Sequence, residues 1–183
     1  MGQKLFFEKE KDEIKIEEIE EVPNVEKKDY VDEKEDTVVT QNKTTVTPQY
    51  QYIGVLEIPK INLKRGFVSP DSISNNVEEN ITILKPISMP NVEKGNFILA
   101  AHSGTGAIAY FNNLYQLQVH DKIYVYYKNK KYTYKIAKIY KQPKNGTIKV
   151  YRDTSKSTIT LITCTNNDDT KQTVYVGNQV AIE

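Results

Sequence analysis

The sequence predicts a mostly β domain, built as a closed barrel or a sandwich, that follows a charged N-terminal tail. The composition changes near residue 50, because seven of the eight glycines and 15 of the 18 aromatic residues lie at or beyond that point. From there on, short runs rich in Val, Ile, Thr and Tyr alternate with Gly, Pro and Asn, which is the pattern of strands and turns. Seven or eight short strands with little helix favour a closed sheet, because closure removes exposed edges.

Residues 1–48 are interpreted as a tail or linker, and residues 49–183 as the folded domain. The tail holds 14 acidic residues, 8 lysines and no arginine, so its charge is about −6, whereas the domain is near +7. A charged stretch this poor in large apolar groups cannot offset the entropy of ordering, so we expect disorder. The alternative is a short helix from Leu5 to Glu21, although its isoleucines form no clean helical face.

Strands are expected in order along the domain. The first ends at Pro59, because proline stops a strand, and Ser69, Pro70 and Asp71 predict the start of a short helix that runs toward Glu79. The run 96–101 is almost continuously apolar, so it suits a strand buried on both faces. Further elements are strands at 52–59, 63–68, 82–84, 123–127, 132–137, 157–163 and 173–182, a helical turn at 111–116 and a loop at 141–156.

Composition also limits the class of protein. The positive domain admits nucleic acid or an anionic polymer such as a cell wall as a partner, but a solvated, Lys-rich surface explains the charge as well. We adopt the second interpretation and expect no nucleic-acid partner. The single cysteine excludes an internal disulfide. The chain has no run of 18 apolar residues and no signal peptide, so we expect no membrane span within it.

Two strand ends carry side chains capable of catalysis. His102 follows the buried apolar run and precedes a Gly-rich turn, and imidazole groups exchange protons near neutral pH. Cys164 ends the run Thr160–Thr163 before a polar loop, where a thiol is accessible and a nearby imidazolium favours the thiolate. Taken alone, each residue is better explained by a structural role, as a hydrogen-bonded histidine or a buried cysteine.

Three segments taken together change that interpretation. They are Ile53–Ile61 (IGVLEIPKI), Lys94–His102 (KGNFILAAH) and Thr160–Cys164 (TLITC). In order and spacing they resemble three successive motifs of the sortases, the cysteine transpeptidases of Gram-positive bacteria, and the likeness covers about residues 50–182. The resemblance implies a closed eight-stranded β-barrel with one or two short helices.

The resemblance also implies the roles of individual residues. Cys164 would be the nucleophile and His102 the general acid and base. Substrate contacts would come from residues beside these two, namely Ala101, Ser103, Thr163 and Thr165.

Sortases cut a sorting signal of the Leu-Pro-x-Thr-Gly type between Thr and Gly through a thioester acyl-enzyme. An amine from a cell-wall precursor or a pilin lysine then resolves the thioester. The resemblance thus implies surface or pilin proteins as substrates, and an enzyme held at the extracellular face of the bacterial membrane by an anchor outside this chain. It implies no cofactor, and although some sortases bind calcium, we expect no metal site here.

The sequence departs from the family at the third catalytic position. Sortases carry an arginine on the strand after the cysteine, and matching Val174–Val176 to that strand places Gln172 at this position. A neutral amide lacks the fixed charge and the bidentate fork of a guanidinium. Lys171 on the same strand, or Arg152 on the loop before the cysteine strand, are the alternatives for a cation. The remaining alternative is that glutamine at this position is a substitution that disables the enzyme or traps its substrate.

Three functions therefore remain open. The first, which we adopt, is a transpeptidase with a modified third residue. The second is a sortase-fold protein of weak or no activity that binds sorting-signal peptides or pilin subunits. The third is a plain β-barrel interaction module, in which the Cys164 sulfur would lie on the order of 10 Å or more from the His102 imidazole.

Overall fold

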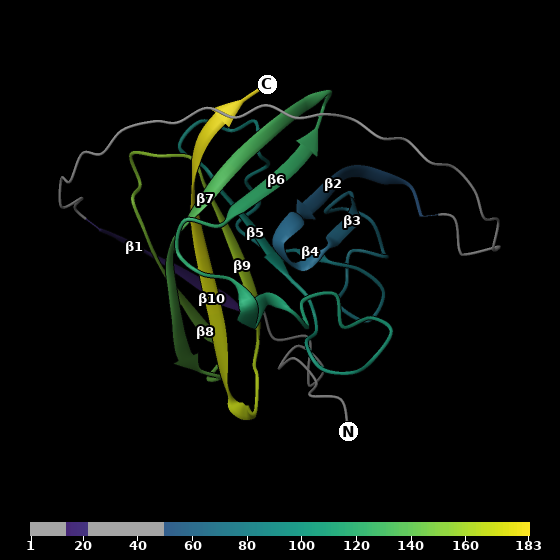
Figure 1. The fold of residues 1–183 in the computed structure, drawn as a ribbon, viewed down its shortest axis with the longest axis vertical. Coiled ribbons are helices and arrows are strands. Elements are labelled where there is room, and N and C mark those ends of the chain that lie inside the picture. The colour runs from purple at the N-terminus through teal and green to yellow at the C-terminus, as the bar shows by residue number, and fades with distance from the viewer. Residues whose placement is uncertain (1–13, 22–49) are drawn as a thin grey trace.

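The structure is a computed structural model that describes residues 14–21 and 50–183. These residues form ten strands and two short 3-10 helices (Figure 1). The strands are β1 (Lys15–Glu20), β2 (Tyr52–Ile58), β3 (Leu63–Val68), β4 (Thr82–Ile83), β5 (Asn96–Ala100), β6 (Lys122–Tyr127), β7 (Lys130–Pro143), β8 (Thr147–Arg152), β9 (Thr158–Thr165) and β10 (Asp168–Ile182). The 3-10 helices are η2 (Pro59–Ile61) and η3 (Leu114–Gln116). The mostly β class is confirmed.

Eight strands form one sheet in the order β3-β2-β6-β7-β10-β9-β5-β4. Neighbouring strands are antiparallel except for β5 and β9, which run parallel. The end strands β3 and β4 contact each other, so the sheet curls into a nearly closed barrel (Figure 1). The predicted eight-stranded barrel is therefore confirmed.

The two faces of the central strands bury different clusters, because successive side chains on a strand point to opposite faces. Odd-numbered side chains such as Phe97, Leu161 and Tyr175 fill the barrel. Even-numbered side chains pack outside the barrel as a second cluster, which we call the outer cluster: Ile98, Ala100, Ile162, Cys164, Val174 and Val176, joined by Val77, Ile148 and Val150. The prediction that run 96–101 is buried on both faces is confirmed.

The outer cluster is covered by β8, which the sequence analysis missed. The loop expected at 141–156 is wrong for most of its length, because β7 continues to Pro143 and β8 follows after a short turn. Ile148 and Val150 alternate with polar neighbours, which is the pattern of a strand with one buried face. That signal was present in the sequence.

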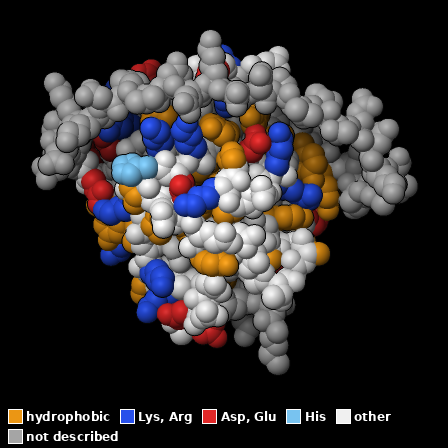
Figure 2. All heavy atoms as spheres, in the orientation of Figure 1, with side chains coloured by type: hydrophobic (Ala, Val, Ile, Leu, Met, Phe, Trp, Pro, Cys, Tyr) orange, Lys and Arg blue, Asp and Glu red, His pale blue; other side chains and the backbone are white. Residues whose placement is uncertain are grey.

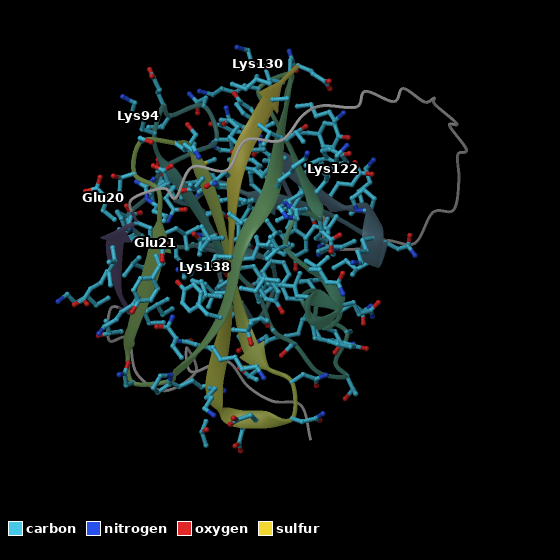
Figure 3. All side chains as sticks on the ribbon, turned by 60° about the vertical axis from the view of Figure 1, so that its left-hand side comes forward. Glu20, Glu21, Lys94, Lys122, Lys130 and Lys138 are labelled. Carbon is cyan, nitrogen blue, oxygen red and sulfur yellow. The ribbon has the colours of Figure 1, made fainter. Side chains whose placement is uncertain are left out.

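The prediction for the tail is wrong for residues 14–21, which form neither helix nor disordered chain. They contain β1, which pairs in parallel with β8 over six residues, and Ile14 and Ile16 pack against the outer cluster. Figure 3 shows Glu21 beside Lys138, with which it forms an ion pair. The strand exists because β8 offers it a hydrogen-bonding edge, which a tail considered alone does not reveal. The rest of the predicted tail lies outside the described residues.

The helix expected from Ser69 toward Glu79 is also wrong, because these residues form consecutive turns. Asparagine side chains bind the local backbone: Asn75 donates to the carbonyls of Pro70 and Ile83, and Asn80 donates to that of Ser74. Such side-chain bonds compete with the helical ladder. The helical turn expected at 111–116 is confirmed as η3.

Candidate active site

Cys164 occupies the last-but-one position of β9 and is 2% exposed. Its side chain belongs to the outer cluster, beside Ile162 and Val174. Two hydroxyl groups connect this strand end to the segment that follows β5. Ser103 Oγ donates to the carbonyl of Cys164 at 3.1 Å, and Thr163 Oγ1 donates to the carbonyl of Ala101 at 2.9 Å. The strand ends that carry Cys164 and His102 are therefore fastened together.

The strand register places His102 next to Cys164. Ala100 pairs with Ile162 in the parallel β5–β9 ladder, and the Ala101 amide donates to the Ile162 carbonyl at 3.3 Å. Two residues further along each chain stand His102 and Cys164, and this spacing keeps both side chains on the face of the outer cluster. Adjacent strands lie about 4.8 Å apart, so the separation expected for the plain interaction module, on the order of 10 Å or more, does not fit this register.

Gln172 lies on the other side of Cys164. The two residues are direct partners in the antiparallel β9–β10 ladder, so their side chains share one face. Gln172 is 3% exposed. The three predicted catalytic positions therefore form one row, in which Cys164 on β9 stands between Gln172 on β10 and His102, two residues beyond the end of β5.

The His102 side chain is held from the turn segment before β4. Its Nε2 atom lies 3.3 Å from Oε1 of Glu78, and the imidazole is largely buried whereas Glu78 is half exposed. The chain after His102 is fixed as well, because the Phe111 amide donates to the His102 carbonyl at 2.9 Å. Gly104 takes a φ of 116°, a conformation open to glycine and strained for other residues. The Gly-rich turn thus lets the chain leave β5 sharply.

A cavity of about 200 Å³ opens at the end of the barrel beside Cys164. Three of the four predicted substrate-contact residues line it, namely Ser103, Thr163 and Thr165. The rest of the wall is mainly aromatic and aliphatic, with one cation and a few polar groups: Phe111, Asn112, Tyr115, Leu117, Ile139, Lys141, Asn166, Thr173 and Tyr175.

The structure does not bring Ala101 to this cavity. Its side chain is fully buried in the core inside the barrel. The odd-numbered Thr163 and Thr165 side chains also leave their strand on the face opposite to the Cys164 thiol. Ala100 and Ile162 are the neighbours that share the face of the thiol.

The electrostatic environment of the thiol contains a residue that the sequence analysis missed. Burial raises the pKa of the Cys164 thiol, and the Lys144 ammonium opposes this effect through a hydrogen bond and through its charge. Lys144 follows β7, 20 positions before Cys164 in the chain. It stands in a Pro-Lys-Asn-Gly turn, which from sequence alone indicates only a hairpin.

The two cations considered from sequence are engaged elsewhere. Lys171 forms an ion pair with Asp168 at 3.2 Å, and its neighbour Gln172 shares the face of Cys164, so Lys171 points away from it. Arg152 is the last residue of β8, and it binds Thr158 at the opposite end of β9. Six residues of strand, about 20 Å, separate Thr158 from Cys164. The alternative in which Arg152 supplies the missing cation is therefore wrong.

Charges elsewhere are dispersed. On the face in Figure 2, Lys and Arg side chains of the described residues stand in separate groups between acidic and uncharged ones. Within residues 14–21 and 50–183, no three His, Cys, Asp or Glu side chains gather closely enough to hold a metal ion. The same residues contain no helix long and apolar enough to cross a membrane.

Comparison with known proteins assigns the family. The model of the sortase domain matches residues 56–180. The chain is 29% identical over 131 residues to Sortase A of Bacillus anthracis, which covers 71% of this chain and 60% of that relative. The chain therefore belongs to the sortase family, and it spans 60% of the length of this curated relative.

Solved structures agree with the assignment. The Clostridium perfringens Sortase D5 transpeptidase superposes with a TM-score of 0.57 at 25% identity, over 71% of this chain and 79% of that one. Sortase C1 from Streptococcus agalactiae superposes with a TM-score of 0.60 at 27% identity, over 71% of this chain and 68% of that one. These relatives come from different sortase classes, so they do not assign a class to this chain.

Proposed function

We propose that this chain is a cysteine transpeptidase that cleaves a sorting signal of the Leu-Pro-x-Thr-Gly type and transfers the resulting acyl group to an amine. The observation that carries this proposal is the row formed by His102, Cys164 and Gln172 on one face of the sheet. A thiol beside an imidazole is the minimal arrangement for activating a sulfur nucleophile. Membership of the sortase family supports the same reaction.

The reaction divides into acylation and transfer. The Cys164 thiol gives its proton to His102, and the sulfur attacks the threonine carbonyl carbon to form a tetrahedral oxyanion. The oxyanion collapses, the bond from carbon to the glycine nitrogen breaks, and the His102 imidazolium protonates the departing amine. A second amine then gives a proton to His102 and attacks the thioester carbon, which releases the thiolate.

The sorting signal binds at the end of the barrel where β5 and β9 terminate. The cavity there lies beside Cys164 and is lined by Ser103, Thr163 and Thr165. Its mainly apolar wall suits an aliphatic side chain of the signal, because apolar surface removed from water stabilises binding. Ala101 would act through its backbone, since its side chain is buried in the core.

Membership of the sortase family supports a proposal for the biological setting. Substrates are surface or pilin proteins that carry the signal, and the acceptor is a cell-wall precursor amine or a pilin lysine. The protein works at the extracellular face of the membrane of a Gram-positive bacterium. Residues 49–183 form the catalytic unit, and β1 packs on it.

The test is cleavage of a fluorescence-quenched Leu-Pro-x-Thr-Gly peptide, with and without triglycine as acceptor. We expect cleavage that leads to a triglycine adduct, complete loss with Cys164→Ala, and a loss of about 10²–10⁴-fold with His102→Ala. Turnover that survives in Cys164→Ala contradicts the proposal.

Gln172 favours one alternative, a sortase-fold protein that binds the signal with little or no turnover. Glutamine at this position lacks the charged hydrogen-bond donor that an arginine would offer to the oxyanion, and the loss of one such donor lowers the rate by about 10²–10³-fold. Isothermal titration with the same peptide separates the two functions. Saturable binding of the peptide without cleavage, in the presence of triglycine, supports the binding function.

A further inference from the structure

The active-site row contains no arginine, although formation of a thiolate and then of an oxyanion calls for a positive charge. Gln172, opposite Cys164, is neutral. Lys171 and Arg152 are paired with Asp168 and Glu18, respectively. A cation in addition to the His102 imidazolium would therefore have to reach the thiol from another element.

The hairpin between β7 and β8 contains such a cation, the ammonium group of Lys144. Gln142 pairs with Gln172, which itself pairs with Cys164, so β7 lies two strands away from the nucleophile. Pro143 pairs with Lys171, and the next residue, Lys144, donates its backbone amide to the Thr170 carbonyl at 3.1 Å. The backbone of Lys144 is therefore fixed against β10, close to the level of Gln172.

The turn then reverses toward the outer cluster. Gly146 has a φ of 84°, and the Asn145 side chain accepts a hydrogen bond from the Thr147 amide at 3.2 Å. β8 then lays Ile148 and Val150 over the cluster that contains Cys164. Lys144 thus stands at the start of the segment that covers the nucleophile, and its ammonium interacts with the Cys164 sulfur.

We propose that Lys144 is a catalytic residue that supplies, from the β7–β8 hairpin, the positive charge at the Cys164 sulfur and at the substrate oxyanion. This role rests on the proposed transpeptidase function. The ammonium keeps its proton throughout. It stabilises the thiolate after the thiol proton has passed to His102, and it donates a hydrogen bond to the oxyanion when the sulfur has attacked the carbonyl carbon.

The other groups around the thiol do not duplicate this charge. Gln172 faces it from β10, Ile148 and Val150 face it from β8, and all three are uncharged. His102 stands beside it and is bound to Glu78. Lys141, on β7, lines the cavity, but it pairs with Thr173 rather than with Gln172, so its side chain leaves the sheet on the face opposite to the thiol. A nearby cation lowers the pKa of a thiol and so raises its reactivity near neutral pH.

The first measurement needs no peptide. The rate of Cys164 alkylation by iodoacetamide is followed from pH 5 to pH 10 in the full chain and in Lys144→Met. We expect the midpoint of the Lys144→Met profile to move up by about one pH unit, with alkylation at pH 7 slowed about 10-fold. Lys144→Arg should keep a profile close to that of the unaltered chain, and Lys171→Met, the matched loss of a lysine, should not change it.

The second measurement uses the peptide. We expect Lys144→Met to lower kcat/KM for cleavage by about 10²-fold. Adding Gln172→Arg to Lys144→Met should recover much of that loss, because the new guanidinium shares the face of Cys164. This rescue also shows that the first variant is folded.

The outcomes separate this inference from the proposed function. An alkylation profile or a cleavage rate that Lys144→Met leaves unchanged overturns the role of Lys144. If the unaltered chain cleaves no peptide, the transpeptidase proposal fails, and the alkylation profile alone decides whether Lys144 acts on the thiol.

Discussion

Ser103 fastens the nucleophile strand to the histidine segment through one buried hydrogen bond. Its hydroxyl donates to the Cys164 carbonyl, and both residues are buried. We expect Ser103→Ala to lower the free energy of unfolding by about 0.5–1.5 kcal/mol. Urea denaturation followed by circular dichroism measures this change. A stability equal to that of the unaltered chain would show that the hydroxyl does not hold the strands together.

Gln172 is the residue at which a charge can be restored. Its side chain shares the face of Cys164, so we expect an arginine at this position to point toward the reacting carbonyl without a change of register. We expect Gln172→Arg to raise kcat/KM for peptide cleavage about 10-fold or more, because a charged, bidentate donor replaces a neutral one. An unchanged rate would mean that the amide is not what limits turnover.

At this scale the sequence says less about the face of a strand on which a side chain lies than about the residue itself. Cys164 and His102 are proposed as the reacting pair because their segments resemble sortase motifs, whereas each strand end alone favours a structural role. Ala101 and Thr163 were chosen as their neighbours, but a shift of one residue along a strand moves a side chain to the opposite face. Lys144 could not be predicted, since only the folded hairpin brings its ammonium to the thiol.

At the scale of elements, β1 is held on β8 by a carboxylate as well as by its ladder. Glu18 accepts hydrogen bonds from Arg152 Nε at 2.8 Å and from Asn96 Nδ2 at 3.0 Å. The Arg152 side chain is buried, whereas that of Glu18 is 26% exposed. Glu18 is therefore the carboxylate partner of a buried guanidinium.

We expect Glu18→Ala to lower the free energy of unfolding by about 1–3 kcal/mol, because it leaves the Arg152 guanidinium buried without this carboxylate. The matched control is Glu17→Ala. Glu17 forms a surface ion pair with Lys15, so its loss should cost clearly less than that of Glu18. Equal effects of the two variants in urea denaturation would refute the anchoring role of Glu18.

Most strands could be predicted from sequence, and the failures share a cause. The strands of the barrel carry apolar, β-branched runs whose pattern is local. β1 has few apolar residues and forms because β8 supplies an edge, and the turns at 69–79 form because asparagine side chains bind the backbone. Both depend on partners that a local pattern does not contain.

At the scale of the whole molecule, buried tyrosines connect stability to pH. Burial raises the pKa of Tyr140 and of Tyr175 to about 12, and burial also raises that of Tyr134. An unfolded tyrosine titrates near pH 10, so above that pH the unfolded chain loses protons that the folded chain keeps. Stability from these groups is fully present below about pH 10 and is lost as the pH rises from about 10 through 12.

We therefore expect the free energy of unfolding to fall between about pH 10 and pH 12, and Tyr175→Phe to reduce the slope of that fall. Urea denaturation at fixed pH steps, with tyrosinate absorbance recorded alongside, provides the measurement. Identical slopes for Tyr175→Phe and the unaltered chain would show that folding does not raise the pKa of this phenol.

The mostly β class could be predicted from composition and pattern, because short patterned strands with little helix favour a closed barrel or a sandwich. The choice of an eight-stranded barrel came from the resemblance to sortases. The parallel pairing of β5 with β9 places the ends of these two strands side by side, and the proposed pair of His102 and Cys164 depends on that placement. Membership of the sortase family agrees with this geometry.

The most direct test is the intact mass of the chain after brief mixing with a Leu-Pro-x-Thr-Gly peptide in the absence of an amine acceptor. We predict a covalent adduct of the peptide portion up to threonine, located on Cys164, released by hydroxylamine and missing in Cys164→Ala. Peptide cleavage without any adduct on Cys164, or an adduct that persists in Cys164→Ala, would contradict a thioester at this residue.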